Sequence, residues 1–199
     1  MIYEIKPGTK GLIFDLDGTL VDSMPIHYEG WKKACERFGT SMDQSFLKNN
    51  SGIPGWVIAE TVIRNGGLQG TVSVEKILNA KLEEFIKKQH LIKPVEPVAE
   101  LVTRYFGILP MAVGTGGHKE AVEGTLEVTG LRKYFSVIVT ANDVINYKPH
   151  PETFLKCAEL MKIDPQFIEV FEDSDLGIEA ATRAGMTGVD VRGWYKSDY

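Results

Sequence analysis

The chain has 199 residues, of which 43% are hydrophobic and 25% are charged. This composition is that of a globular protein long enough to bury a hydrophobic core, and it excludes disordered and fibrous classes. The formal net charge of -5 argues against nucleic acid as the main partner, because binding to a phosphate backbone requires a basic face. A phosphorylated small molecule stays compatible with this charge, since a metal ion and one or two lysines can neutralise a phosphate locally.

The N-terminal residues, the apolar stretches and the cysteines predict the cellular compartment of the protein. The first eleven residues lack the basic start and apolar run of a signal peptide, and no apolar stretch is long enough to span a bilayer. The two cysteines, Cys35 and Cys157, lie far apart and lack metal-ligand spacing, so we expect buried free thiols. We therefore expect a soluble, cytoplasmic monomer that has no membrane partner.

Five short apolar runs predict strands that are buried on both faces. They are rich in β-branched and aromatic residues and are bounded by turn residues. Helical patterns follow three of them, near residues 118–129, 151–161 and 175–184. Strands and helices that alternate in this way predict an α/β fold with a parallel, Rossmann-like sheet and helices on both faces. The five runs are Gly11–Asp15, Met111–Thr115, Ser136–Thr140, Ile168–Asp173 and Thr187–Val191.

Residues 21–93 depart from this alternation. They contain no convincing strand and at least three helical patterns, the first of which places His27 and Trp31 on one apolar face. We interpret this stretch as a helical cap domain. It is inserted into a core domain that residues 1–20 and 94–199 form together.

Two carboxylates separated by one residue end the first predicted strand. Asp15 and Asp17 are followed by Gly18 and Thr19, and they can converge on one site only if the backbone turns, which Gly18 permits. Desolvated carboxylates repel one another, which costs energy unless a cation is bound. The motif therefore predicts cation-assisted chemistry rather than a turn with solvated aspartates.

Polar residues also follow three later strands. Thr115 and Gly116 precede a helix, where a hydroxyl and glycine N–H groups form an anion cradle. Lys148 stands in the loop after the third strand, where we expect it to bind phosphate. Glu172 and Asp173 close the fourth strand, and their hard oxygen atoms suit Mg²⁺ when gathered with those of the first motif.

The order of these motifs resembles that of the haloacid dehalogenase superfamily. Asp-x-Asp-Gly-Thr comes first, then a threonine after a strand, then Lys-Pro and finally Glu-Asp-Ser. Residues Val170–Gly185 and the His27/Trp31 pair are similar to its β-phosphoglucomutase-like branch. Within that branch, Met111–Gly116 and Phe154–Met161 resemble bacterial fructose-1-phosphatase/6-phosphogluconate phosphatase-type hydrolases.

The resemblance implies a sheet order of 5-4-1-2-3, with the first and fourth strands adjacent at its centre. In open α/β sheets ligands bind at such a switch point, at the carboxyl ends of the strands. The resemblance also implies a Mg²⁺ ion held by Asp15, Asp17 and Asp173, with help from Glu172.

By the same resemblance, we expect a phosphatase that forms an aspartyl-phosphate intermediate. Asp15 is the expected nucleophile, and Asp17 the expected general acid and then general base. Thr115, Gly116 and Lys148 would bind the phosphate. His27 and Trp31 are candidate residues on the substrate side of the cap, although Trp31 is expected mainly to pack.

A β-phosphoglucomutase is the alternative function. The family grips a second phosphate with a cap arginine, and Gly55 stands at the comparable position here. A mutase without that arginine would lose the phosphoryl group to water, so hydrolysis is favoured. A catalytically silent binding protein and a dehalogenase are disfavoured, because Asp15, Asp17, Lys148 and Asp173 are all present. Fructose 1-phosphate and 6-phosphogluconate are both candidate substrates.

Overall fold

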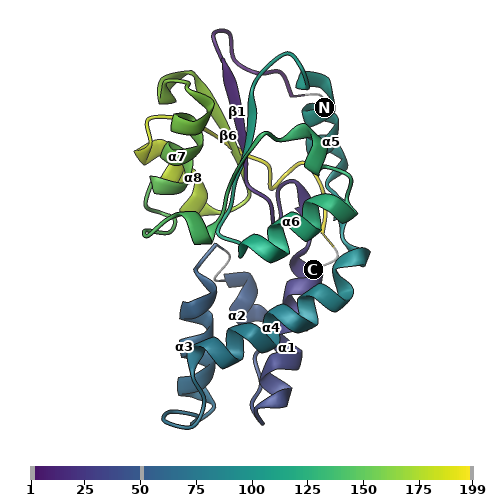
Figure 1. Cartoon of the computed structure of the whole chain (residues 1–199), viewed down its shortest axis with the longest axis vertical. Helices are drawn as coiled ribbons and strands as arrows, with labels where there is room; N and C mark the ends of the chain where they lie inside the picture. Colours follow the sequence, from purple (N-terminus) through teal and green to yellow (C-terminus); the bar gives the residue numbers. More distant parts are fainter. Residues whose placement is uncertain (1–2, 50–51, 198–199) are drawn as a thin grey trace.

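A five-stranded parallel sheet forms the centre of the fold (Figure 1). The computed structural model describes residues 3–49 and 52–197. The strands lie in the order β5-β4-β1-β6-β7, so the expected parallel α/β sheet is confirmed. Their bounds are β1 (Gly11–Phe14), β4 (Met111–Gly114), β5 (Val137–Val139), β6 (Ile168–Glu172) and β7 (Thr187–Asp190).

The first and fourth long strands lie side by side, as expected. In their register Phe14 of β1 pairs with Phe171 of β6 on one side and with Val113 of β4 on the other. The strand numbers differ from the expected 5-4-1-2-3 because two short strands outside this sheet, β2 and β3, take their own numbers.

Helices cover both faces of the sheet (Figure 1). Leu12 and Phe14 of β1 pack with helices α5 and α6, whereas Ile13 packs on the opposite face with α7 and α8. Burial on both faces explains why the strand reads as a continuous apolar run. The helices are α5 (Glu96–Tyr105), α6 (Lys119–Val128), α7 (Glu152–Met161) and α8 (Asp175–Arg183), and short 3-10 helices connect them at Arg132–Tyr134, Ala141–Asp143 and Pro165–Phe167.

Helix α5 was not predicted from the sequence. Its buried residues Val98, Leu101 and Val102 follow helical spacing, and Pro97 lies in its first turn, where the missing N–H costs nothing.

Helices also lie beyond the end of the sheet (Figure 1), and we refer to the described residues within 24–91 as the helical segment. They are α1 (Met24–Arg37), α2 (Gln44–Asn49), α3 (Gly55–Asn65) and α4 (Val74–Lys88), followed by a 3-10 turn at Gln89–Leu91. Trp31, Cys35, Val62 and Ile77 form a separate small core here. Both cysteines are buried and free, as expected.

Two short strands connect the helical segment to the sheet. β2 (Val21–Asp22) and β3 (Lys93–Pro94) pair antiparallel, so the expectation of no strand within residues 21–93 was wrong at both ends. Two residues are too few for the alternation that identifies a strand in a sequence. No helix within residues 3–49 and 52–197 has the length and apolarity to cross a membrane.

Candidate active site

The polar residues expected at the site follow four neighbouring strands. Asp15 comes after β1, Thr115 after β4, Lys148 in the loop after β5, and Asp173 after β6. The backbone N–H of Asp15 donates to the carbonyl of Phe171 at 3.0 Å, so pairing with β6 continues up to the first carboxylate. Because the strands are parallel, their carboxyl ends meet at one edge of the sheet.

Lys148 joins Asp15 to Glu172 in a buried cluster. Its Nζ donates to Asp15 Oδ1 at 2.6 Å and to Glu172 Oε1 at 2.7 Å. Burial alone would lower the pKa of Lys148, but the two carboxylates outweigh it and raise the pKa above its ordinary value. Lys148 is therefore a fixed positive charge, and the second oxygen of Asp15, Oδ2, has no partner among the described residues.

Glu172 has both carboxylate oxygens engaged within the protein. Oε1 accepts from Lys148, while Oε2 accepts from the backbone N–H and the hydroxyl of Ser174 at 2.7 and 2.8 Å. Gly177 faces this carboxyl group so closely that a Cβ there would overlap it. The geometry makes Glu172 a positioning residue for Lys148.

Ser174 also starts helix α8, since its hydroxyl accepts from the N–H of Gly177 at 3.0 Å. The N-cap is thus Ser174 and not Asp175, although aspartate is also a common N-cap residue. Asp175 is instead the first helical residue and forms an exposed ion pair with Arg192.

Asp173 lies against the turn that follows β1. Its Oδ1 accepts from the Thr19 hydroxyl at 3.1 Å, and Gly18, at φ +86°, leaves no room for a Cβ beside its carboxyl group. Burial and the charge of Glu172 raise the pKa of Asp173 to about 7. Burial also raises the pKa of Asp15, with smaller contributions from Glu172 and Asp173. The cluster thus has more negative charge than Lys148 balances.

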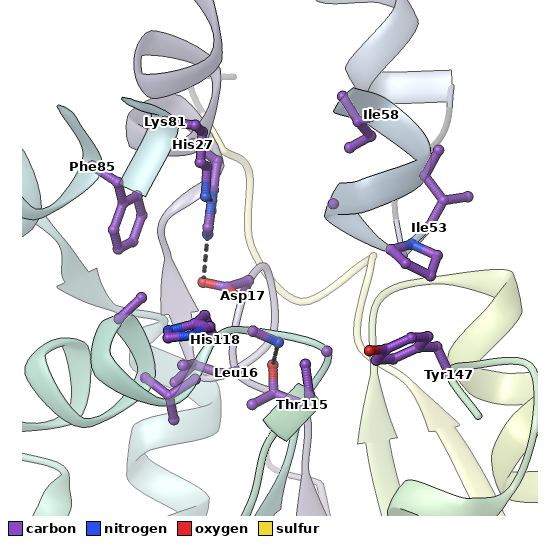
Figure 2. A pocket seen from close by; sticks show the side chains of 18 of the residues that line it. Leu16, Asp17, His27, Ile53, Ile58, Lys81, Phe85, Thr115, His118 and Tyr147 are labelled. Atoms are coloured by element: carbon purple, nitrogen blue, oxygen red, sulfur yellow. Dashed lines mark hydrogen bonds and ion pairs between the residues drawn. The ribbon is translucent and has the colours of Figure 1, made fainter. Parts of the chain in front are cut away.

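Asp17 points toward His27 of the helical segment (Figure 2). Ser23 Oγ donates to its Oδ1 at 2.5 Å, and His27 Nε2 lies 3.0 Å from the same oxygen, close but not aligned as a hydrogen bond. Burial alone would raise the pKa of Asp17, but these neighbours lower it to about 2. Asp17 is therefore held as a carboxylate.

A second basic residue, Lys81, contacts His27 on its Nδ1 side. Lys81 Nζ donates to His27 Nδ1 at 2.7 Å, and the His27 ring stacks on Phe85 with centroids 4.3 Å apart. Burial, followed by the nearby charge of Lys81, lowers the pKa of His27, so the ring is neutral near pH 7. With Nδ1 accepting, the ring proton lies on Nε2 and faces Asp17.

The turn after β4 offers hydrogen-bond donors to an anion. The buried Thr115 hydroxyl accepts from the N–H of Gly117 at 3.0 Å, which leaves its own hydrogen free to donate. Gly116 is exposed, and helix α6 starts three residues later. N–H groups at such a helix start favour negative charge.

A cavity of about 830 Å³ lies between the strand ends and the helical segment (Figure 2). Asp15, Thr115 and Lys148 line it on the sheet side. The helical segment contributes mainly apolar walls, including Ile53 and Trp56. The site is thus charged where the strands end and largely apolar opposite.

The structure gathers the expected residues in two groups. Asp15, Lys148, Glu172 and Asp173 form the buried cluster, and Asp17 pairs with His27 instead. Among residues 3–49 and 52–197, no three acidic, His or Cys side chains are arranged so that they could hold a metal ion by themselves. Trp31 is buried in the core of the helical segment and also lines the cavity.

Two residues of the Asp17 environment were missed as site residues. A serine directly before α1 has the pattern of a helix start, but the Ser23 hydroxyl donates to Asp17 and caps no helical N–H. No local pattern shows that Lys81 meets His27, 54 residues earlier.

Comparison with known proteins decides the family. The model of the haloacid dehalogenase-like hydrolase family matches residues 12–191. The chain belongs to this family. The expected enzyme class, a phosphoric monoester hydrolase, is confirmed for this family member.

Relatives and solved structures of this hydrolase family cover most of the chain. Fructose-1-phosphate phosphatase YqaB of Escherichia coli is 39% identical over 92% of this chain and 96% of its own. A phosphorylated carbohydrates phosphatase of Thermotoga maritima is 31% identical, covering 89% and 82%. The crystal structure of a Pseudomonas syringae hydrolase matches with a TM-score of 0.81 and 25% identity, covering 94% of this chain and 87% of that chain.

Proposed function

We propose that the protein is a Mg²⁺-dependent phosphatase of small sugar phosphates that works through an aspartyl-phosphate intermediate. The observation that carries the proposal is the Asp15 carboxylate, held by Lys148 at the cavity wall with Oδ2 unengaged. In this proposal residues 1–20 and 94–199 form the catalytic core. Residues 21–93 form a cap domain that selects the substrate.

The donor set fits a divalent cation. Asp15 and Asp173 are buried carboxylates whose pKa values are raised first by burial and then by neighbouring carboxylates, so that a cation beside them would stabilise their charged forms. Together with the backbone carbonyl of Asp17 they would hold Mg²⁺, which prefers oxygen ligands. Glu172 would act from outside this set, through Lys148. When bound, Mg²⁺ neutralises charge on the transferring phosphoryl oxygens.

In the first step Asp15 Oδ2 attacks phosphorus. A bond forms between this oxygen and phosphorus, the bond to the leaving alcohol breaks, and Asp17 gives that alcohol oxygen a proton. Lys148 offsets the anionic charge, while the Thr115 hydroxyl and the Gly116 N–H donate to the remaining oxygens.

In the second step water releases the phosphate. Asp17 takes a proton from water, the water oxygen bonds phosphorus, and the bond to Asp15 breaks. Its low pKa keeps Asp17 deprotonated and so able to accept this proton, although a pKa of about 2 by itself makes it a weak base. Its role as an acid requires the charge of bound substrate to raise that pKa, as a nearby like charge does.

The cavity supports a small, partly apolar leaving group. Its volume of about 830 Å³ is typical of small-molecule sites, and its apolar wall suits the C–H faces of a sugar. The two phosphatase relatives point to the same class, so fructose 1-phosphate and 6-phosphogluconate are the first substrates to test.

A β-phosphoglucomutase is the competing function. A mutase must retain an intermediate by gripping its second phosphate, and no arginine lines the cavity in the described part of the chain. Gly55, beside Leu78 and Trp31, stands where a cap arginine would be needed. Feeding β-glucose 1-phosphate should give inorganic phosphate, whereas glucose 6-phosphate would identify a mutase.

A phosphate-release screen tests the proposal. Sugar phosphates are incubated with the protein, with and without Mg²⁺, and the Asp15→Asn variant serves as the blank. We expect Mg²⁺-dependent release that this variant abolishes. Release by Asp15→Asn close to that of the wild type would overturn the proposal.

A further inference from the structure

The segment after β7 returns to the turn at residues 17–23, which we call the catalytic turn. Residues 191–197 leave β7 and cross to the loop between β1 and α1. There the Tyr195 hydroxyl donates to the carbonyl of Gly18 at 3.1 Å, and the Ser197 hydroxyl donates to Asp22 Oδ1 at 2.7 Å. These bonds join residues 177 and 175 positions apart in the sequence.

This segment is anchored before it reaches the loop. The N–H of Val191 donates to the carbonyl of Glu172 at 3.0 Å. The Trp194 ring packs against Tyr3 and Phe171, with centroids 5.2 and 6.0 Å apart. The contacts of Val191 and Trp194 with β6 therefore fix the position of Tyr195 next to Gly18.

The two bonds hold the residues next to Asp17 and to its partner Ser23. Gly18 follows Asp17 directly, and Asp22 directly precedes Ser23, whose hydroxyl donates to Asp17. The turn closes on itself through the bond from Gly18 N–H to the Val21 carbonyl at 2.9 Å. A rotation of the Gly18 peptide would move Asp17 relative to its neighbours. The Tyr195 bond opposes that rotation.

We propose that Tyr195 and Ser197 are positioning residues for Asp17, so that the C-terminal segment is part of the catalytic apparatus. This inference rests on the proposed phosphatase function. Neither residue lines the cavity, so both act through the backbone and side chain they hold. Loss of either hydroxyl should impair the proton transfers of Asp17 more than the attack by Asp15.

Leaving-group dependence separates these two effects. A sugar phosphate needs a proton on its leaving alcohol, whereas p-nitrophenyl phosphate releases a stable phenolate without one. The ratio kcat/KM reports the steps up to formation of the phosphoenzyme. We expect Tyr195→Phe to lower kcat/KM about fivefold to tenfold on the sugar phosphate and less than about twofold on p-nitrophenyl phosphate, the size of one lost hydrogen bond. Ser197→Ala should act in the same direction.

Tyr3→Phe is the matched control. The Tyr3 ring packs against the same Trp194, but the hydroxyl that this variant removes donates to Glu169 at 2.6 Å and not to Gly18 or Asp22. It should leave both kcat/KM values unchanged. On the Asp17→Asn background, Tyr195→Phe should cause no further loss, because the residue it positions is gone.

Equal losses on both substrates, or no loss in either variant, would overturn the inference. So would a further loss on the Asp17→Asn background. A wild-type protein that releases no phosphate from any sugar phosphate would instead refute the proposed function itself. A wild type that depends on Asp15 but is indifferent to Tyr195→Phe and Ser197→Ala would refute only the positioning role.

Discussion

The ammonium group of Lys148 lies 2.6 Å from Asp15 Oδ1, although 133 residues separate them in the chain. Both side chains are buried, and Glu172 holds the same ammonium group from its other side. The contact fixes one oxygen of the carboxylate and leaves the other for chemistry. It also keeps a positive charge where a phosphate would enter.

Replacing Lys148 should therefore stop the reaction while the fold persists. We expect Lys148→Met to lower kcat/KM more than 100-fold, because the transferring phosphoryl group loses its fixed counter-charge. Lys148→Arg should not restore activity, since a planar guanidinium does not fit the space of a buried ammonium between two carboxylates. Steady-state phosphate release measures both variants. Activity of Lys148→Met within tenfold of the wild type would contradict this role.

Gly177→Ala should disturb Lys148 from a distance. A Cβ at this position would overlap the carboxyl group of Glu172, which then has to leave Lys148 and Ser174. We expect a loss of about 1–3 kcal/mol in the free energy of unfolding and at least a tenfold loss in kcat/KM. Glu179→Ala, a change at an exposed residue of the same helix α8, is the control. Denaturant titration and phosphate release check both values, and a fully active Gly177→Ala would refute the positioning role of Glu172.

Asp173→Asn should stabilise the metal-free protein in a pH-dependent way. Folding raises the pKa of Asp173 from 3.8 to about 7, so the folded state binds an additional proton between these pH values. Its contribution to the free energy of unfolding therefore falls as the pH rises across this interval and stays low above it. Asn carries no charge, and its Oδ1 can still accept from Thr19.

In chelator near pH 8, we expect Asp173→Asn to melt about 4–8 °C above the wild type, a gain on the order of 2 kcal/mol. Near pH 4 the two should melt together. Adding Mg²⁺ at the higher pH should raise the Tm of the wild type and leave that of Asp173→Asn unchanged. Thermal scans at both pH values test this. A variant that melts below the wild type in chelator at high pH would contradict it.

Trp56 should contribute to substrate selection. It lines the cavity and yet is 42% exposed, which leaves its ring open to a sugar. We expect Trp56→Ala to raise KM for a sugar phosphate about tenfold with kcat nearly constant, while Trp56→Phe keeps most of the affinity. Acetyl phosphate, which has no sugar face, should show no change. Ile145→Ala, at an exposed residue outside the cavity, is the control, and an unchanged KM in Trp56→Ala would contradict this role.

Much of the site could be predicted because its residues obey a local pattern. Asp15, Thr115 and Asp173 each end an apolar run, and a parallel sheet brings such ends to one edge. Lys148 lies in the loop that follows β5, at the same edge of the sheet. For this reason both the central sheet and the buried cluster at its edge could be predicted from the sequence.

The partners of these residues were less readable, because they depend on how distant segments pack. Nothing near Lys81 indicates that α4 brings it to His27, and nothing near Tyr195 indicates that the chain returns to Gly18. The direction of Asp17 was hidden for the same reason, since Ser23 reads as the start of α1. These contacts depend on the packing of distant segments, and the hydrophobic periodicity of one segment carries no information about them.

The covalent step on Asp15 is the central claim, and trapping it is the most direct test. A sugar phosphate and Mg²⁺ are mixed with the protein, quenched in acid within the first turnover, and the intact mass and peptide map are measured. We predict a mass gain of one phosphoryl group, located on Asp15 and absent from Asp15→Asn. Phosphate release by the wild type with no such adduct, or with the phosphoryl group on another residue, would contradict the account.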